Sequence, residues 1–442
     1  MEFKNKKPII SKLIEIITPQ FKLVPSVTKN ISPTITNTDC LLSAFAMFNL
    51  KFPSLLKFND MFRKKENSAE AQNLKNLFKI KKVPSDTYMR EILDEISPKS
   101  LNNSFLDLHK YTQQKGLYEK YNFLGKNKLI PIDGSEFFNS NEIKCNHCLT
   151  KEHKNGVTSY HHQALACVIA HPGMKQVLPF APEFICNEDG NTKNDCEINS
   201  GKRLLERLRK DCPDLEGIIL ADSLFSNAPF IKMIKDKNFH YIIGAKPGNH
   251  VYLYDSLKVY EEKNIIKKIS FEKDGFLYEI SYINNIWLNS SGDTFVNYIH
   301  LEETNKKGRK NIFSWVTDLL IEDNNCFEIT IGGRTRWHIE NQTFNTLKNQ
   351  GYQFEHNFGH GNKNLCNVFA MTMFLAFLVD QIQELSCYFF QTSLYSHSAR
   401  YCFWEKFKSV FSIFIIESWE LFYKIANDNF VGIKVPITLN SS

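Results

Sequence analysis

The sequence has no internal repeat and no low-complexity segment, and its composition is not that of a disordered chain. Solenoids, propellers and linker-like proteins are therefore excluded. With 442 residues, the chain has enough material for two to four domains and a large core.

The sequence also lacks an apolar run long enough to cross a bilayer. Its most apolar stretch, residues 365–379, is interrupted by Asn367 and Thr372, whereas a transmembrane helix needs roughly 20 apolar residues. We expect a buried helix there and no membrane partner. No secretory leader is apparent, and the eleven cysteines, an odd number, are scattered along the chain. This pattern is typical of free thiols in a reducing compartment, so we expect a cytoplasmic protein.

Charge is distributed unevenly. Residues 1–130 hold 22 Lys and Arg against 12 Asp and Glu, a balance of +10, whereas the remaining residues carry −4. A basic segment joined to a slightly acidic remainder is typical of a polyanion-binding region beside a catalytic domain that holds carboxylates. The alternative is the lysine-rich composition of an AT-biased genome.

Residues 1–125 have mostly helical patterns, including a helix that begins after Pro84 with Ser85 or Asp86 as its cap. Lysines and arginines lie across these helices, so we predict a basic helical DNA-binding region. An ordinary solvated helical cap is the alternative.

From residue 126 the pattern changes to strands. Three successive strands, a helix, a short buried strand, a second helix and another strand are predicted over residues 126–245. This order predicts an α/β fold, a mixed sheet with helices on its faces and with its first and fourth strands adjacent, as in ribonuclease H. Residues 246–310 are predicted to form a β-rich insertion, residues 311–360 the second part of the core, and residues 361–442 a helical C-terminal region.

Two predicted strands end in an aspartate, Leu129-Ile-Pro-Ile-Asp133 and Ile218-Ile-Leu-Ala-Asp222. Placed side by side, they would bring two carboxylates to one edge of the sheet, where a divalent cation would relieve their repulsion. Glu340 on a crossing helix would complete an oxygen-ligand site for two Mg²⁺ ions, which implies phosphodiester chemistry. For each aspartate taken alone, a turn or cap residue is the alternative.

The predicted helix that carries Glu340 runs from Arg334 to Lys348. Trp337, Phe344 and Leu347 share one face at helical spacing, so that face is expected to pack on a core.

The chain from about Leu129 to Glu384 resembles DDE transposases of the bacterial insertion-sequence-four kind. The motifs that carry this resemblance are Ile132-Asp133-Gly134, Leu220-Ala221-Asp222, Trp315-Val316-Thr317-Asp318-Leu319 and, most specifically, Arg336-Trp-His-Ile-Glu-Asn-Gln-Thr-Phe-Asn-Thr-Leu-Lys348.

By this resemblance, Asp133, Asp222 and Glu340 are the catalytic, metal-binding acids, and Arg336 contacts phosphate. The sequence departs from the family pattern at two places: the expected tyrosine is Gly333, and the expected lysine is Leu347, with Lys348 one place later as its substitute. Trp315 is similarly placed to an aromatic that stacks on a flipped base, with a core residue as the alternative.

The resemblance implies Mg²⁺-dependent cutting of transposon ends and their joining to target DNA, with Mn²⁺ able to replace Mg²⁺. The expected partner is double-stranded DNA, bound by a homodimer, in a bacterial, nucleoid-associated protein. Two alternatives are a structure-selective DNA nuclease and a decayed transposase that only binds DNA.

A second group of possible metal ligands follows Asp133. Cys145-Asn-His-Cys148 and the histidines after it have the donor types and spacing of a structural zinc site, for which Cys145, Cys148, His153 and His161 are the predicted ligands. A reduced thiol pair in a lysine-rich loop is the alternative.

Overall fold

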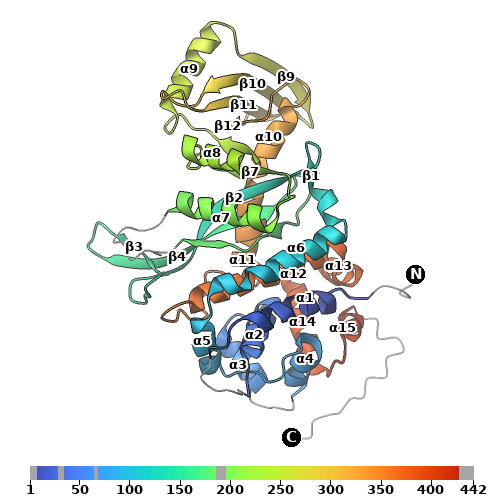
Figure 1. Ribbon diagram of the computed structural model, residues 1–442. Helices are drawn as coiled ribbons and strands as arrows, with labels where there is room; N and C mark the ends of the chain where they lie inside the picture. Colours follow the sequence, from blue (N-terminus) through green and yellow to red (C-terminus); the bar gives the residue numbers. More distant parts are fainter. Residues whose placement is uncertain (1–6, 28–33, 64–67, 186–195, 428–442) are drawn as a thin grey trace.

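The fold is seen in a computed structural model that describes residues 7–27, 34–63, 68–185 and 196–427 (Figure 1). Twelve of its strands form one sheet, with the main path β3-β4-β2-β7-β8-β12-β11-β10-β9. The strands are β1 Asn122–Phe123, β2 Asn127–Ser140, β3 Leu149–Glu152, β4 Thr158–Ile169, β5 Leu178–Pro179, β6 Glu183–Ile185, β7 Gly217–Ala221, β8 His240–Gly244, β9 Lys267–Lys273, β10 Phe276–Trp287, β11 Phe295–Asn305 and β12 Lys310–Thr317.

The helices fall into three groups: an N-terminal set, a set on the sheet and a C-terminal set. The N-terminal set comprises α1 Ile10–Leu23, α2 Asn37–Asn49, α3 Leu55–Arg63, α4 Ala69–Phe78, α5 Asp86–Glu95 and α6 Asn102–Gln114, with short 3₁₀ turns at Pro98–Leu101 and Leu117–Tyr121. The sheet carries α7 Glu197–Asp211, α8 Ala228–Asp236, α9 Val251–Glu262, α10 Cys326–Arg334, a π-helix Ile339–Phe344 and α11 Asn345–Asn349. The C-terminal set is α12 Leu365–Ser386, α13 Tyr388–Tyr395, α14 Arg400–Ile413 and α15 Trp419–Ala426.

The predicted ribonuclease H-like order of strands is confirmed. β2 pairs antiparallel with β4, β4 pairs antiparallel with β6, and β2 pairs in parallel with β7, which in turn is parallel to β8. The first and fourth strands of the core, β2 and β7, are therefore neighbours. All five residues of β7 are buried, as expected of a central parallel strand with helices on its faces.

The predicted β-rich insertion is β-rich in its second part and helical in its first. Helix α9 precedes the meander β9 to β12, and only Leu253 and Leu257 of this helix are buried. The meander continues the core sheet because β12 pairs antiparallel with β8, Trp315 opposite Gly244. Strand β12 thus returns the chain to the core sheet after the insertion. The insertion lies at the upper end of the molecule in Figure 1.

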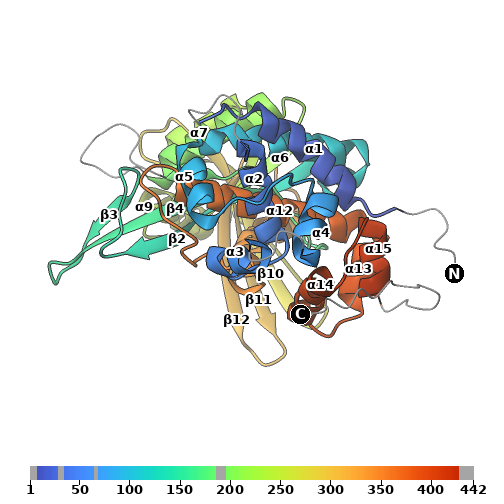
Figure 2. The same ribbon diagram turned by 90° about the horizontal axis from the view of Figure 1, so that it is seen from below.

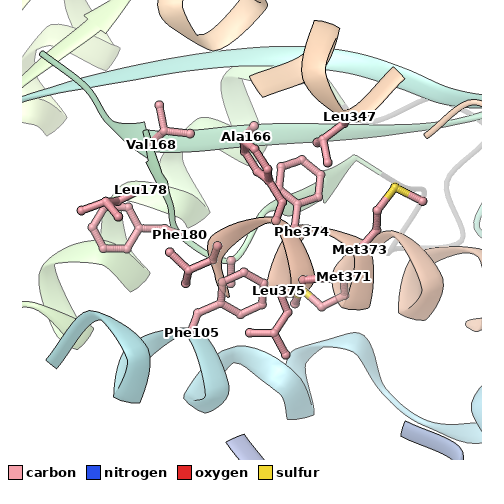
Figure 3. Packing of buried hydrophobic residues seen from close by; sticks show 14 of the residues in the cluster. Phe105, Ala166, Val168, Leu178, Phe180, Leu347, Met371, Met373, Phe374 and Leu375 are labelled. Carbon is pink, nitrogen blue, oxygen red and sulfur yellow. The ribbon is translucent and has the colours of Figure 1, made fainter. Parts of the chain in front are cut away.

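Helix α12 is the buried helix that the sequence predicts. By length and composition this helix could cross a membrane, because its most apolar 18 residues have a mean hydropathy of 1.7. However, 94% of these 18 residues are buried inside the fold, as in the core helix of a soluble protein. N-terminal and C-terminal helices surround it (Figure 2). Its Phe374 and Leu375 pack between Phe105 of α6 and Ala166 of β4, which joins the helical body to the sheet (Figure 3).

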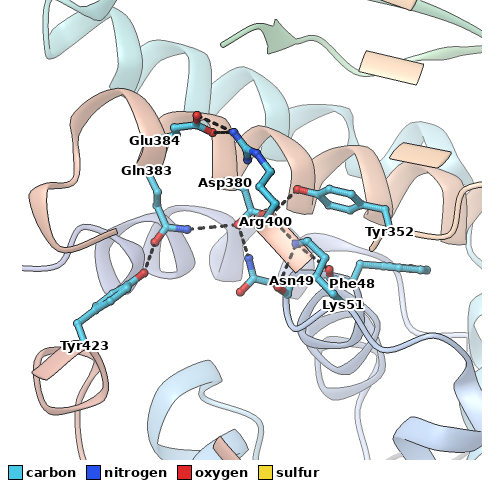
Figure 4. Close-up of polar contacts among 9 residues, drawn as sticks. All are labelled: Phe48, Asn49, Lys51, Tyr352, Asp380, Gln383, Glu384, Arg400 and Tyr423. Atoms are coloured by element: carbon cyan, nitrogen blue, oxygen red, sulfur yellow. Dashed lines mark hydrogen bonds and ion pairs between the residues drawn. The ribbon is translucent and has the colours of Figure 1, made fainter. Parts of the chain in front are cut away.

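A buried polar network fixes α12 against the N-terminal helices (Figure 4). Asp380 accepts hydrogen bonds from Asn49 at 3.0 Å, Lys51 at 2.6 Å and Tyr352 at 2.5 Å. The Lys51 ammonium also bonds the carbonyls of Phe48 and Asn49. Segments more than 300 residues apart in the chain are thereby locked together.

Candidate active site

The strand pairing places Asp133 and Asp222 beside each other. Pro131 of β2 pairs with Leu220 of β7, so each aspartate lies two residues beyond the last parallel pair, at the same edge of the sheet. Asp222 follows the end of β7, as predicted. Strand β2, by contrast, continues through Asp133 to Ser140, because beyond the parallel pairs it still pairs with β4.

Arg336 joins two of the three predicted acids. Its Nη1 donates to Oδ2 of Asp133 at 2.9 Å, and its Nη2 donates to Oε1 of Glu340 at 2.5 Å. Burial works against the guanidinium charge, but the hydrogen bond to Glu340 and the charges of both carboxylates outweigh it and raise the pKa of Arg336. One cation thus pairs with two acids that lie far apart in the sequence.

Asp133 lies in a strongly anionic environment. Burial raises its pKa to about 6, and the charges of Glu340 and Asp222 act in the same direction, while Arg336 and the N–H of Gly134 act against them. Asp133 is therefore close enough to both other predicted acids, Glu340 and Asp222, for their charges to act on it.

Glu340 lies in a π-helix rather than in a regular α-helix. The segment Ile339–Phe344 has the wider, i→i+5 bonded turn of a π-helix, and its buried residues are Ile339, Thr343 and Phe344. Trp337, which α-helical spacing places on the face of Phe344, is instead 52% exposed. The predicted helix from Arg334 is therefore two elements: α10 ends at Arg334, and a second helical segment carries Glu340. Single π turns inside helices frequently occur at functional sites.

A fourth carboxylate reaches the same edge. Glu197 is the first residue of α7, and its carboxylate fills the space that a side chain at Gly134 would need. Burial raises the pKa of Glu197, and so do the charges of Asp133 and Asp222. No specific signal in the sequence marks this residue, because an acid in the first turn of a helix is common.

The comparisons with known proteins identify the family. Residues 145–377, just over half of the chain, match the family model described as "Transposase DDE domain". The chain belongs to the transposase DDE domain family. Within the matched residues lie Asp222 and Glu340, while Asp133 precedes them. No curated protein matches the sequence significantly. A solved structure of the piggyBac transposase synaptic complex with hairpin DNA, obtained by cryo-EM, is 12% identical, with 99% of this chain and 85% of that chain covered and a TM-score of 0.40.

The structure explains one departure of this transposase DDE domain from the motif. A Cβ at Gly333 would lie 2.6 Å from Cε2 and 2.7 Å from Nε1 of Trp315, so a tyrosine has no room there. Trp315 is 6% exposed, stacks on Phe313 and belongs to the core cluster beneath the insertion. The expectation that Trp315 stacks on a DNA base is corrected accordingly: the indole is a core residue, because it is buried and already stacks on Phe313.

The two predicted phosphate ligands of the transposase DDE domain differ in their surroundings. Arg336 is partly buried between the acids, with 17% of its side chain exposed. Lys348 lies further along, where its Nζ pairs with Oε1 of Glu355 at 2.7 Å. Leu347, which stands at the lysine position of the family, is fully buried in the core.

The predicted zinc ligands are only partly brought together. Cys145 and Cys148 lie side by side, but His153 instead bonds the Ser159 hydroxyl at 2.9 Å. His161 also points elsewhere, because successive residues of β4 face opposite sides of the sheet, and its Nδ1 has no hydrogen-bond partner among the described residues. These two histidines are corrected: the imidazoles beside the cysteines are those of His162 and His360.

Proposed function

We propose that this chain is a DNA transposase of the bacterial insertion-sequence-four kind, which cuts transposon ends and joins them to target DNA. The observation that carries this proposal is the convergence of Asp133 and Glu340, 207 positions apart, on the guanidinium of Arg336 beside Asp222. Membership of the transposase DDE domain family supports it.

The acids suit divalent metal ions in number, charge and chemistry. The charges of Asp222 and Glu340 act to raise the pKa of Asp133, and carboxylates this close together are stabilised when a cation neutralises them. Mg²⁺ prefers oxygen ligands. Asp133, Asp222 and Glu340 would hold Mg²⁺, or Mn²⁺ in its place. When bound, the metal ions supply an activated water or 3′-hydroxyl and stabilise the leaving oxygen.

Arg336 has a second role in this proposal. Its guanidinium balances Asp133 and Glu340 in the metal-free protein, and once these acids are neutralised it becomes available to a phosphate of double-stranded DNA. Lys348 would contribute a second phosphate contact after release from its partly exposed pair with Glu355. The basic helical N-terminal region would hold DNA as well. A homodimer that pairs two DNA ends, in the bacterial nucleoid, completes the proposal.

A cleavage assay tests the acids. The substrate is labelled DNA that contains the terminal inverted repeats flanking the gene, incubated with Mg²⁺. Asp133→Asn, Asp222→Asn and Glu340→Gln are each expected to slow cleavage by about 10²-fold or more while leaving end binding in a gel-shift assay close to wild type. Glu262→Gln, an exposed acid at the end of α9, is the control. A variant of the three that cuts at the wild-type rate removes that residue from the site.

The products separate the transposase from its two alternatives. Joined target molecules are expected of a transposase, nicks without joining indicate a structure-selective nuclease, and binding without cleavage indicates a decayed transposase. The last alternative has some support in Gly333 and Leu347, which replace two residues of the family motif.

A further inference from the structure

The side chains of Cys145, Cys148, His162 and His360 converge on one point. Their ligand atoms all lie within 4.8 Å of one another, and three of the four residues are buried. The two cysteines do not form a disulfide bond, because their sulfurs are 3.8 Å apart. Two thiols and two imidazoles from three separate segments therefore face each other in the interior.

The spacing of these atoms is that of a tetrahedral zinc site. With typical zinc–ligand bond lengths, a tetrahedron has about 3.8 Å between two sulfurs, about 3.6 Å between sulfur and nitrogen and about 3.3 Å between two nitrogens. The observed separations are 3.8 Å for sulfur to sulfur, 3.3 to 3.5 Å for three of the sulfur–Nε2 pairs, and 3.1 Å for Nε2 to Nε2. We infer that Cys145, Cys148, His162 and His360 form a structural zinc site.

The surroundings hold the ligands in this arrangement. Nδ1 of His360 donates to the carbonyl of Gly361 at 2.9 Å, which leaves Nε2 free to bind a metal. The backbone N–H of Cys145 donates to the sulfur of Cys148 at 3.3 Å, and the N–H of Cys148 bonds the carbonyl of Cys145, so the two thiols are fixed by one tight turn. The ring of Phe138 lies 4.4 Å from that of His360 and shields the site from water.

The loop that carries His360 is itself anchored. Asp94 at the end of α5 accepts hydrogen bonds from four successive N–H groups, residues 362–365, at 2.9 to 3.0 Å. These bonds lower the pKa of Asp94 despite its burial. The backbone next to His360 is therefore held in place by hydrogen bonds, which fixes the position of this ligand.

A zinc ion at this site would cross-link segments that are distant in the sequence. Cys145 and Cys148 lie in the connection between β2 and β3, His162 lies on β4, and His360 precedes α12, 198 positions after His162. The metal would therefore tie the strands beside Asp133 to the segment that follows the Glu340 helix. Closing so long a loop, together with metal–ligand bonding, stabilises the folded state.

Metal analysis of the full-length protein tests the inference without DNA or Mg²⁺, so its outcome is independent of the proposed function. We expect one zinc per chain after purification. After exchange for Co²⁺, we expect the charge-transfer and d–d absorption bands of a tetrahedral thiolate–imidazole site. A zinc content far below one per chain, together with a Co²⁺ spectrum that lacks these bands, overturns the site.

Variants test which histidines bind. His360→Ala and Cys148→Ser are expected to lose the zinc and the tetrahedral Co²⁺ bands, whereas His153→Ala and the exposed Cys402→Ser are expected to retain both. Loss of zinc in His153→Ala with retention in His360→Ala overturns the ligand set. If His360→Ala does not fold, the wild-type zinc content and Co²⁺ spectrum still decide the question. A zinc chelator is also expected to lower the Tm of the wild-type protein.

Discussion

Nη1 of Arg336 lies 2.9 Å from Oδ2 of Asp133, and both side chains are largely buried, with 17% and 21% exposed. The guanidinium of Arg336 therefore neutralises part of the negative charge of the acids when no divalent ion is bound. Its ion pairs also hold Asp133 and Glu340 together in the metal-free site. Protonation and metal binding at this site consequently affect the stability of the whole chain.

The first prediction concerns the pH dependence of stability without metal. Because the folded-state pKa of Asp133 is raised to about 6, the folded protein binds more protons than the unfolded chain between about pH 4 and pH 6. Stability is therefore lost as pH rises through this window, and the penalty is fully present above pH 6. In EDTA, Asp133→Asn is expected to gain stability relative to wild type as pH rises from 5 to 7.5, by about 1.4 kcal/mol, since the rest of the effect lies below pH 5.

Urea unfolding of both proteins at several pH values measures this effect. Mg²⁺ should raise the Tm of the wild-type protein at pH 7.5 and have less effect on the variant. A difference in unfolding free energy that stays constant from pH 5 to 7.5 would contradict the assignment of the raised pKa to Asp133.

The second prediction concerns Glu197. Because its carboxylate shares the anionic edge with Asp133 and Asp222, Glu197→Gln is expected to weaken Mn²⁺ binding and slow cleavage by about tenfold, less than Glu340→Gln. Calorimetric titration with Mn²⁺ and the cleavage assay provide the readouts. Glu206→Gln, an exposed acid on the same helix, is the control and should leave both unchanged. Equal behaviour of the two variants would place Glu197 outside the site.

The third prediction concerns the contact between Gly333 and Trp315. An alanine at position 333 would place its Cβ 2.6 Å from the indole, so Gly333→Ala should lower the unfolding free energy by about 1–3 kcal/mol. Combination with Trp315→Leu should recover part of this loss, giving a clear coupling energy in a double-mutant cycle. Gly248→Ala is the control, since an added Cβ there meets no atom within 4 Å. Additive effects of the two substitutions would show that the two residues do not oppose each other.

Much of the site could be predicted from the sequence, for identifiable reasons. The apolar run before Asp222 shows where β7 finishes, and the run before Asp133 shows where the parallel pairing of β2 finishes, although β2 itself continues to Ser140. The parallel pairing follows from the order of strands and helices. Glu340 stands in the most specific motif. The π-helix was not predicted, because its extra residue changes which side chains face the core without changing composition.

Other features depend on contacts that the sequence does not encode locally. His360 lies 212 positions after Cys148, so no spacing rule connects them. The adjacent histidines His161 and His162 differ only in which side of β4 they face, which the register of the strand decides. Helix α9 was not predicted separately from the β-rich insertion of residues 246–310, because its only buried residues are Leu253 and Leu257, too few to mark a helical face in the sequence.

The fourth prediction concerns the buried ion pair in the helical body. The side chains of Lys51 and Asp380 are 1% and 2% exposed, so Asp380→Ala leaves a buried ammonium without its carboxylate and should cost about 3–5 kcal/mol in unfolding free energy. The double variant Lys51→Met/Asp380→Leu should regain much of that loss. Asp255→Ala, which breaks the exposed pair with Lys258, is the control and should change the free energy by less than about 1 kcal/mol. A small effect of Asp380→Ala would show that water reaches Lys51.

The packing of the N-terminal helices around α12 has a consequence for folding during synthesis. Twelve of the thirteen residues of α2 are buried, yet the Asp380 that Asn49 bonds is synthesised 331 residues later. At ribosomal rates of about 5–20 residues per second, that interval is roughly 15–65 s. During this time the face of α2 that packs on α12 is left uncovered, which makes the nascent chain prone to aggregate. A transcript truncated before codon 365 would yield a product that aggregates.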